Sequence, residues 1–267
     1  MTKLNHSSVQ LSPRNHKPRL PMQKHLSALA LAFIALMLCH TPASGAISIT
    51  DTGSQNGQIN GGATLANITL SSSVNTAVFV LFSTDNDSAF AATFAGEAMT
   101  VVQTSSARAV LAYLANPLSL SGDLVVNPGG TGSGNEIAYW GVASGIDTSS
   151  LQVSDGSSIG SGNHTINNYT SLNSGDVVYS VFGINNQSGE AYTGGLVALD
   201  GSGSAHDAII TTNTIASSGP FTPSVPFGGS ANGSQVGASI AFTAIPEPSA
   251  AMLGSIGAIL LLRRRRQ

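Results

Sequence analysis

The chain has 267 residues, of which only 9% are charged, against about 25% in a typical soluble domain. Nine of the ten Lys and Arg residues lie before residue 26 or in the last five positions, and Arg108 is the single cation between them, whereas all 13 acids lie from Asp51 to Glu247. A body with one cation is unable to neutralise a row of phosphates, which argues against nucleic-acid binding. The single Cys39 excludes an intrachain disulfide and a cysteine-based zinc site.

The N-terminal 46 residues (1–46) are typical of a signal peptide. A basic segment over residues 1–25 precedes the uncharged stretch LSALALAFIALML at residues 26–38. Thirteen apolar residues suit a signal-peptide core and are short for a transmembrane helix. Ser44 and Ala46 are small residues at positions −3 and −1 of a cleavage site after Ala46. We therefore expect export through the Sec translocon and cleavage by signal peptidase; the alternative is an N-terminal membrane anchor.

Residues 47–244 are expected to form one all-β domain, an antiparallel β-sandwich of the jelly-roll or immunoglobulin-like kind. Short runs rich in Val, Ile, Thr and Tyr alternate with clusters of Gly, Ser, Asn and Asp, a pattern typical of strands joined by turns. Outside the two ends no stretch keeps a 3.6-residue apolar period for three turns, which argues against helices and favours a sandwich. The expected strands lie at residues 64–70, 77–82, 91–94, 99–104, 107–114, 123–126, 136–142, 176–184, 195–199, 207–212 and 236–243.

The same strands supply the expected core and most of the aromatic side chains. The aromatic residues suit either the core or a sugar-stacking platform, so a carbohydrate-binding surface stays open as an alternative. They are Tyr113, Tyr139, Trp140, Tyr169, Tyr179 and Tyr192. The expected core consists of Val78, Val80, Phe82, Phe94, Val110, Ala112, Tyr113, Trp140, Val142, Val178, Tyr179 and Val181.

Three patterns in the body bear on catalysis. Residues 156–160 (GSSIG) formally match G-x-S-x-G, but a nucleophile elbow needs a strand before the serine and a helix after it. The flanks here are a Gly/Ser loop and an expected strand, although His164 and His206 are available as bases. Glu97 and Glu136 are the only glutamates before residue 190, and a carboxylate pair for glycoside hydrolysis stays open. A secreted hydrolase is therefore an alternative, and no residue is assigned as catalytic.

One short segment is a weak candidate for calcium binding. Asp85-Asn86-Asp87 places two carboxylates and an amide within three residues, and calcium prefers clustered oxygen ligands on loops. The segment lacks the glycine and distal glutamate of an EF-hand loop, so a polar turn is the simpler interpretation. Calcium at Asp85 and Asp87 is the only cofactor considered, because the two lone histidines are more typical of surface or core residues than of zinc ligands.

The C-terminal residues 245–267 combine three features of a membrane-directed tail. The two prolines of the triplet Pro246, Glu247 and Pro248 enforce an extended peptide. An apolar segment follows at residues 250–262 (AAMLGSIGAILLL). The chain then continues with Arg263, Arg264, Arg265 and Arg266. A helix of 13 residues spans roughly 20 Å, short of the roughly 30 Å hydrocarbon core, but snorkelling arginines and local thinning make up the difference. Arginines stay on the cytoplasmic side. Since the basic N-terminal segment is also expected inside, the body should lie on the far side of the membrane.

This tail resembles the PEP-CTERM sorting signal of exported bacterial proteins. The match covers the Pro246-Glu247-Pro248 triplet, the short helix with Gly254 and Gly257, and the four terminal arginines, and a signal peptide stands at the other end. The resemblance implies that exosortase, a membrane-embedded cysteine transpeptidase, recognises the triplet, cleaves near it and releases the protein from its helix. Because the family occurs in Gram-negative bacteria that make extracellular polysaccharide, it also implies the outer surface or biofilm matrix. A plain tail anchor is the alternative.

A looser resemblance covers residues 94 to about 184. Four segments there look like a recurring module of secreted bacterial β-sandwiches, whose shared positions are turns, strand ends and core. It supports the fold and implies no catalytic residue. The segments are FAGEAMT at 94–100, YLANP at 113–117, SGDLVV at 121–126 and SGID at 144–147.

These features together predict an exported, non-enzymatic protein of the cell surface or extracellular matrix. Its expected partners are the Sec translocon, signal peptidase, exosortase, the inner membrane before processing, and extracellular polysaccharide in the matrix. A carbohydrate-binding adhesin is the first alternative and a secreted hydrolase is the second.

Overall fold

The regular structure of the described residues is antiparallel β-strand throughout, which confirms the expected all-β class. The structure is a computed structural model that describes residues 45–59, 61–84, 89–103, 109–129, 136–160, 163–184, 192, 195–199, 207–226 and 235–245; at 157–160 and 199 only the backbone is described. These residues belong to one compact unit, Ala43–Glu247. The remainder of the two ends of the chain, including the segments expected to be a signal peptide and a tail helix, lies outside the described residues.

The first half of the domain consists of two sheets. The first central sheet has the strand order β1-β9-β3-β7-β6, and the first outer sheet has the order β2-β8-β4-β5. The first strand of this half thus pairs with its last, β1 with β9. The strands are β1 (Ser48–Asn56), β2 (Ala63–Thr69), β3 (Thr76–Ser83), β4 (Ala91–Phe94), β5 (Glu97–Ala98), β6 (Thr100–Gln103), β7 (Ala109–Ala115), β8 (Ser121–Asn127) and β9 (Ile137–Ser144).

The second half repeats this plan. The second central sheet has the order β10-β19-β14-β16-β15, and its first and last strands are again paired. Two small sheets, β11-β12-β18 and β13-β17, form the second outer layer. The strands are β10 (Gln152–Asp155), β11 (Ser157–Gly160), β12 (Asn163–Ile166), β13 (Tyr169–Leu172), β14 (Val177–Ile184), β15 (Val197–Leu199), β16 (Asp207–Thr214), β17 (Gly219–Phe221), β18 (Ser224–Pro226) and β19 (Gln235–Phe242).

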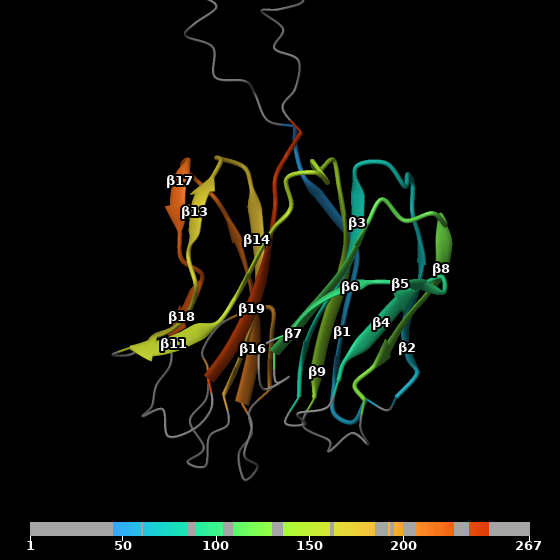
Figure 1. Cartoon of the computed structure of the whole chain (residues 1–267), viewed down its shortest axis with the longest axis horizontal. Helices are drawn as coiled ribbons and strands as arrows, with labels where there is room; N and C mark the ends of the chain where they lie inside the picture. Colours follow the sequence, from blue (N-terminus) through green and yellow to red (C-terminus); the bar gives the residue numbers. More distant parts are fainter. Residues whose placement is uncertain are drawn as a thin grey trace, which may run out of the picture. The chain divides into compact units, whose positions relative to one another are not determined.

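The two central sheets pack face to face, with an outer layer on the far side of each (Figure 1). Side chains of a strand alternate between its two faces, and on β3 both faces are buried. Val80 and Phe82 pack towards the first outer sheet, whereas Phe79 and Leu81 pack towards the second central sheet. A simple two-sheet sandwich buries only one face of each sheet. Burial of both faces explains why the central strands read as continuous apolar runs.

The core between the central sheets (the central core) is built around an aromatic cluster. The Phe79 ring centroid lies 4.9 Å from that of Tyr179 and 5.1 Å from that of Phe242, both on the second central sheet. Tyr139 of β9 stacks on Tyr179 at 5.8 Å. Offset and tilted pairs at these separations are favourable beyond the area they bury. This cluster therefore joins the two halves of the domain.

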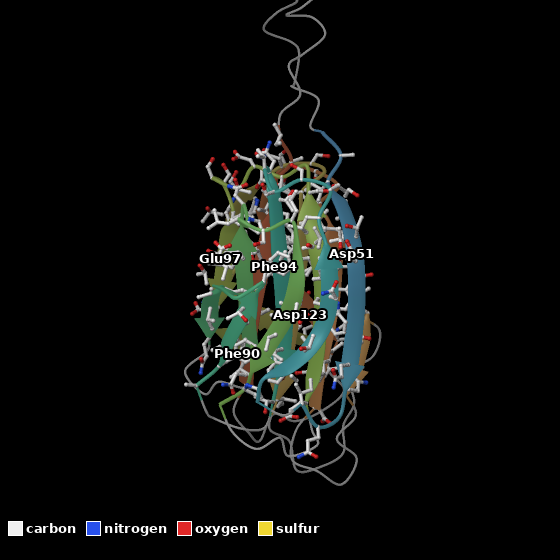
Figure 2. All side chains as sticks on the ribbon, turned by 90° about the vertical axis from the view of Figure 1, so that its right-hand side faces the viewer. Asp51, Phe90, Phe94, Glu97 and Asp123 are labelled. Atoms are coloured by element: carbon white, nitrogen blue, oxygen red, sulfur yellow. The ribbon has the colours of Figure 1, made fainter. Side chains whose placement is uncertain are left out.

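The first outer sheet has one buried face and one exposed face, the latter turned to the viewer in Figure 2. Ile68 and Leu124 point into the core, whereas the exposed face carries hydroxyl, amide and carboxylate groups. On this face the Asn67 side-chain amide donates a 2.8 Å hydrogen bond to the Asp123 carboxylate. Such alternation is typical of an antiparallel sheet with water on one side.

All eleven strands expected from the sequence are present, with ends shifted by a few residues at most. The other strands were not expected, because they lack an apolar run: β1, β5, the short strands β10 to β13, and β17 and β18. β1 (SITDTGSQN) is a polar edge strand that pairs with β9 through a bulge between Thr50 and Gly53. A Cβ atom at Gly53 would clash with the Trp140 ring. Pairing with a buried strand therefore makes β1 a strand.

Replacing Phe79 by Ala should destabilise the whole domain. The ring is fully buried between the central sheets, and such truncations cost about 3–5 kcal/mol. We expect guanidinium to unfold the wild-type domain in one transition. Trp140 fluorescence reports on the first half of the domain, and far-UV circular dichroism reports on all strands. Thr64→Ala on the exposed face should change stability by less than about 0.5 kcal/mol. Separate transitions for the two probes, or a Phe79→Ala variant as stable as Thr64→Ala, would contradict the shared core.

Candidate functional site at the chain exit

The chain enters and leaves the domain at one point, here called the exit end (Figure 1). The Gly45 amide donates a 2.9 Å hydrogen bond to the Ile245 carbonyl, and the Ile245 amide donates a 3.3 Å bond to the Gly145 carbonyl. Next to them Ile146 and Ala244 form an isolated antiparallel bridge. Residues 45 and 245, the first and the last that the structure describes, therefore lie side by side.

The strand structure begins directly after the expected signal-peptide cleavage point. Ala46 is exposed, Ile47 packs against the central core, and Ser48 pairs with Ser144 in the first central sheet. Gly145 has a φ of +73°, and a Cβ atom there would lie 2.9 Å from the Ala46 carbonyl oxygen. Glycine is thus favoured at 145 by its conformation and by the close approach of residue 46. Ser44 lies outside the described residues.

A buried carboxylate anchors the last described segment. Asp176 has almost no exposed surface, and its two oxygens accept hydrogen bonds from the Ala244 amide at 3.3 Å and the Asn173 amide at 2.8 Å. Burial raises the pKa of this carboxyl, and the backbone hydrogen bonds oppose that rise. Asp176 is therefore a structural group that ties the turn before β14 to the point where the chain leaves.

Asn116 joins three loops of the exit end. Its Oδ1 accepts a 2.9 Å hydrogen bond from the Asn75 amide in the β2–β3 loop (residues 70–75), and its Nδ2 donates a 2.9 Å bond to Thr148 Oγ1 in the loop after β9. Its own amide donates to the Thr76 carbonyl at 2.8 Å, and Ile146 donates to the Asn75 carbonyl at 3.2 Å. Asn116 also begins the β7–β8 loop (residues 116–120) at a φ of +51°, which asparagine tolerates well.

The loop after β9 is closed by its own acidic residue. Asp147 accepts hydrogen bonds from the Ser149 amide, the Ser149 hydroxyl and the Ser150 hydroxyl at 3.0, 2.6 and 2.7 Å. These bonds, those of Ser149 first, hold the pKa of the carboxyl below its usual range. The Asp147 amide donates to the Thr243 carbonyl at 2.8 Å. In the sequence, the only signal for Asn116, Gly145 and Asp147 was their place in the segments YLANP and SGID, whose shared positions are turns, strand ends and core.

Several sequence candidates lie outside the described residues: Pro246, Glu247, Pro248, the arginines Arg263, Arg264, Arg265 and Arg266, the calcium candidates Asp85 and Asp87, and His206. Within the described part of the chain, no group of three or more His, Cys, Asp and Glu side chains is arranged to hold a metal ion. The described residues also form no helix whose length and hydrophobicity would let it cross a membrane.

The G-x-S-x-G segment does not have the setting of a nucleophile elbow. Gly156 lies between β10 and β11, and β11 runs straight into an antiparallel pairing with β12, where Ile159 is opposite His164. No helix follows within the described residues. His164 is fully buried, and its Nδ1 lies 2.6 Å from the Tyr192 hydroxyl oxygen. The structure therefore places this histidine in a hydrogen bond with a tyrosine.

Burial sets the ionisation of the His164–Tyr192 pair. Desolvation lowers the pKa of His164 to about 4, so the ring is neutral at physiological pH. Desolvation, and after it the negative charge of Asp207, raises the pKa of Tyr192. Phe182 packs edge-on against the histidine ring at 5.1 Å. The pair thus belongs to the core of the second outer layer.

The two candidate glutamates lie on different elements of the first half. The Glu136 side chain, which directly precedes β9, is fully buried and accepts a hydrogen bond from the Ile59 amide. Glu97 in β5 of the first outer sheet accepts a 3.0 Å bond from the Leu118 amide. Figure 2 shows Glu97, Asp51 and Asp123 at separate positions on one side of the domain. Each of these two glutamates therefore binds a backbone amide, and the structure does not bring them together as a hydrolytic pair.

The aromatic residues proposed for sugar stacking belong to the core. Tyr139, Trp140, Tyr169, Tyr179 and Tyr192 are all buried, and the half-buried Tyr113 packs against the central core. The Tyr169 hydroxyl lies 2.7 Å from the Ser239 hydroxyl of β19. Burial thus leaves five of the six without an open ring face for a ligand, and Tyr113 is half-buried.

Comparison with known proteins finds no relative of this chain. No protein-family model matches it, and no curated protein and no solved structure is significantly similar to it. Its function therefore has to follow from its own residues.

Replacing Asn116 by Ala should loosen the exit end. The substitution removes both side-chain hydrogen bonds and places a residue with low left-handed propensity at a φ of +51°. We expect a loss of about 1–3 kcal/mol in the free energy of unfolding. Asn116→Gly keeps the backbone conformation without the hydrogen bonds and should lose less. Equal stability of wild type and both variants in denaturant unfolding would show that the network contributes nothing.

His164 should make the domain less stable as the pH falls. Its pKa is lowered to about 4 in the folded chain and is about 6.5 when unfolded, so between these values the unfolded chain binds the extra proton. Stability should fall by about 3 kcal/mol from pH 6.5 to pH 4 on this account alone. Denaturant unfolding over this range measures it. The double variant His164→Phe/Tyr192→Phe removes both partners together and should show a shallower pH dependence; an unchanged slope would contradict the assignment.

Proposed function

We propose that this chain is an exported, non-enzymatic protein of the cell surface or extracellular matrix, sorted by exosortase through a C-terminal PEP-CTERM tail. In this proposal the Sec translocon exports the chain, and signal peptidase then cleaves behind Ala46, which leaves residues 47–267. The apolar segment 250–262 and the terminal arginines hold the protein at the inner membrane. Exosortase then recognises Pro246-Glu247-Pro248 and releases the domain towards the exterior, where extracellular polysaccharide surrounds it.

The observation that carries the proposal is the shared exit of the two chain ends. Both expected targeting segments have their basic ends on the cytoplasmic side, so a domain on the far side must start and finish at its membrane-facing end. In the mature chain Ser48 pairs with Ser144, and the Ile245 amide donates a 3.3 Å hydrogen bond to the neighbouring Gly145 carbonyl, so the domain starts and finishes at one end. The body therefore suits a chain that is attached to the membrane first by one end and then by the other.

The body favours a structural or surface role over a hydrolase. Of the residues considered for catalysis, His164 and Glu136 are buried and bonded within the fold, and no helix follows the serine segment in the part of the chain that the structure describes. The described residues contain no Lys or Arg, and the exposed face of the first outer sheet carries small polar groups. The carbohydrate-binding alternative has no stacking surface among the six aromatic residues.

We infer that each half of the domain is a jelly roll. A jelly roll is a long hairpin rolled into two sheets, so its first strand pairs with its last, its second with its second-last, and so on inwards. In the first half β1 pairs with β9, β2 with β8, β3 with β7 and β4 with β5. In the second half β10 pairs with β19 and β14 with β16, while β12 and β13 pair with β18 and β17. This supports the jelly-roll form of the expected sandwich.

Replacing the triplet by alanines (Pro246→Ala/Glu247→Ala/Pro248→Ala) should block processing. Wild type in a Gram-negative host with exosortase is expected to begin at Ile47, to lose the terminal arginines and to leave the membrane fraction. The variant should keep Arg263–Arg266 and stay in that fraction, as wild type should in a strain without exosortase. Intact mass and cell fractionation measure both.

Pro220→Ala/Pro226→Ala is the matched control, because it removes two exposed prolines of the body and leaves the triplet intact. It should be processed like wild type. A triplet variant that matures and localises as the control does would refute the sorting proposal, and the tail would then be an ordinary anchor.

A further inference from the structure

Three exposed aliphatic side chains lie on the two loops that Asn116 joins. Leu118 is 88% exposed, Val74 is 66% exposed and Leu120 is 51% exposed. Figure 1 shows the β2–β3 and β7–β8 loops at the end of the domain where β1 begins and β19 ends. We call these three side chains the exit-end patch. Exposed aliphatic side chains on neighbouring loops at one end of a domain point to a surface that another phase or molecule covers.

The exit-end patch is held in place by hydrogen bonds. The Leu118 amide donates to the Glu97 carboxylate at 3.0 Å, and the Leu70 amide donates to the Leu120 carbonyl at 2.6 Å. The bonds of Asn116 to Asn75 and Thr148 join the same loops to the segment at the chain exit. The loops therefore present their aliphatic side chains on a fixed support that is continuous with the point where the chain leaves.

The two loops themselves are uncharged, and carboxylates stand beside them. The loops read LSSSVN and NPLSL and contain no charged residue. Glu97 accepts a hydrogen bond from the Leu118 amide, Asp147 accepts from the hydroxyls of Ser149 and Ser150, and Asp51 lines a hollow together with Leu70 and Ser71. Membrane surfaces with anionic lipids repel carboxylates, so a contact with lipid has to be made by the serine and aliphatic side chains of the two loops.

The length of the remaining chain identifies the surface. Four residues, 246–249, separate Ile245 from the apolar segment 250–262, and four extended residues span at most about 14 Å. A domain attached to an inserted tail helix by so short a connection has its exit end close to the lipid headgroups. The large surface that lies next to the exit end in this arrangement is therefore the bilayer.

We propose that Val74, Leu118 and Leu120 form a lipid-contacting surface that inserts into the interfacial region of the bilayer while the tail is anchored. This inference rests on the proposed membrane insertion of the tail. The lipid contact would assist sorting, because an exit end that lies on the bilayer keeps the Pro246-Glu247-Pro248 triplet at the membrane surface, within reach of a membrane-embedded enzyme. Three aliphatic side chains attach only weakly on their own, so loss of the tail helix releases the domain.

The test places a polarity-sensitive fluorophore at single positions of the processed chain, residues 47–267, in vesicles of phosphatidylethanolamine and phosphatidylglycerol. This chain lacks the apolar segment 26–38 and contains no cysteine, so the introduced cysteines of Leu118→Cys and Val74→Cys alone carry the label. Thr64→Cys is the matched control, because Thr64 is exposed near the start of β2 and β2 runs towards the exit end. We expect iodide quenching at 118 and 74 to be at least about threefold weaker than at 64, with a blue-shifted emission, because an interfacial side chain is shielded from water.

Flotation of the vesicles separates this inference from the proposal beneath it. Protein that floats but is quenched equally at all three positions overturns the lipid-contacting surface and leaves the tail anchor standing. Protein that does not float overturns the anchor and the inference together. Shielding at 118 that persists in detergent and grows with protein concentration assigns the patch to a second copy of the chain and also overturns the inference.

Discussion

The contact between the two central sheets is the constraint on which the rest of this structure depends. Phe79, Tyr179 and Phe242 interlock there, and the strands that carry them are buried on both faces. A sheet buried on both faces has no polar side, so its sequence must be apolar at successive positions. Burial of apolar surface is the main favourable term in the free energy of folding. It also makes the two halves of the domain one core instead of two independent sandwiches.

The position of the chain ends follows from the pairing within each half. β1 pairs with β9 and β10 with β19, all antiparallel, so each half returns the chain to the end at which it entered. The last residues of the domain thus meet the first, and Asp176 and Asn116 secure the loops around that point. The sorting proposal requires this arrangement of the domain. The same arrangement brings the exposed Leu118 and Val74 to the exit end.

Strands with an apolar run were predictable from the sequence, and strands without one were not. β3 (TAVFVLFS) and β14 (VVYSVFGI) combine β-branched and aromatic residues over eight positions, a pattern typical of buried strands. β1, β12 and β18 instead consist largely of polar or turn-forming residues. They are strands because a neighbouring strand supplies their hydrogen-bond partners. Local β-propensity does not depend on such partners, so it did not predict these strands. The candidate site was likewise predictable only in part. The YLANP segment at 113–117 indicated a turn or strand end, but the sequence did not predict which loops Asn116 joins, because these loops are distant in sequence.

The sequence by itself determined the all-β class, the low charge of the body and the features of its two ends, because each depends on residues that are neighbours along the chain. Only the tertiary structure decided that there are four layers, that His164 and Glu136 are buried and bonded, and that Gly45 meets Ile245. These outcomes depend on which faces pack together and on pairings between residues up to about two hundred positions apart. Burial and long-range hydrogen bonding are properties of the packed chain, so no local pattern of residue types specifies them.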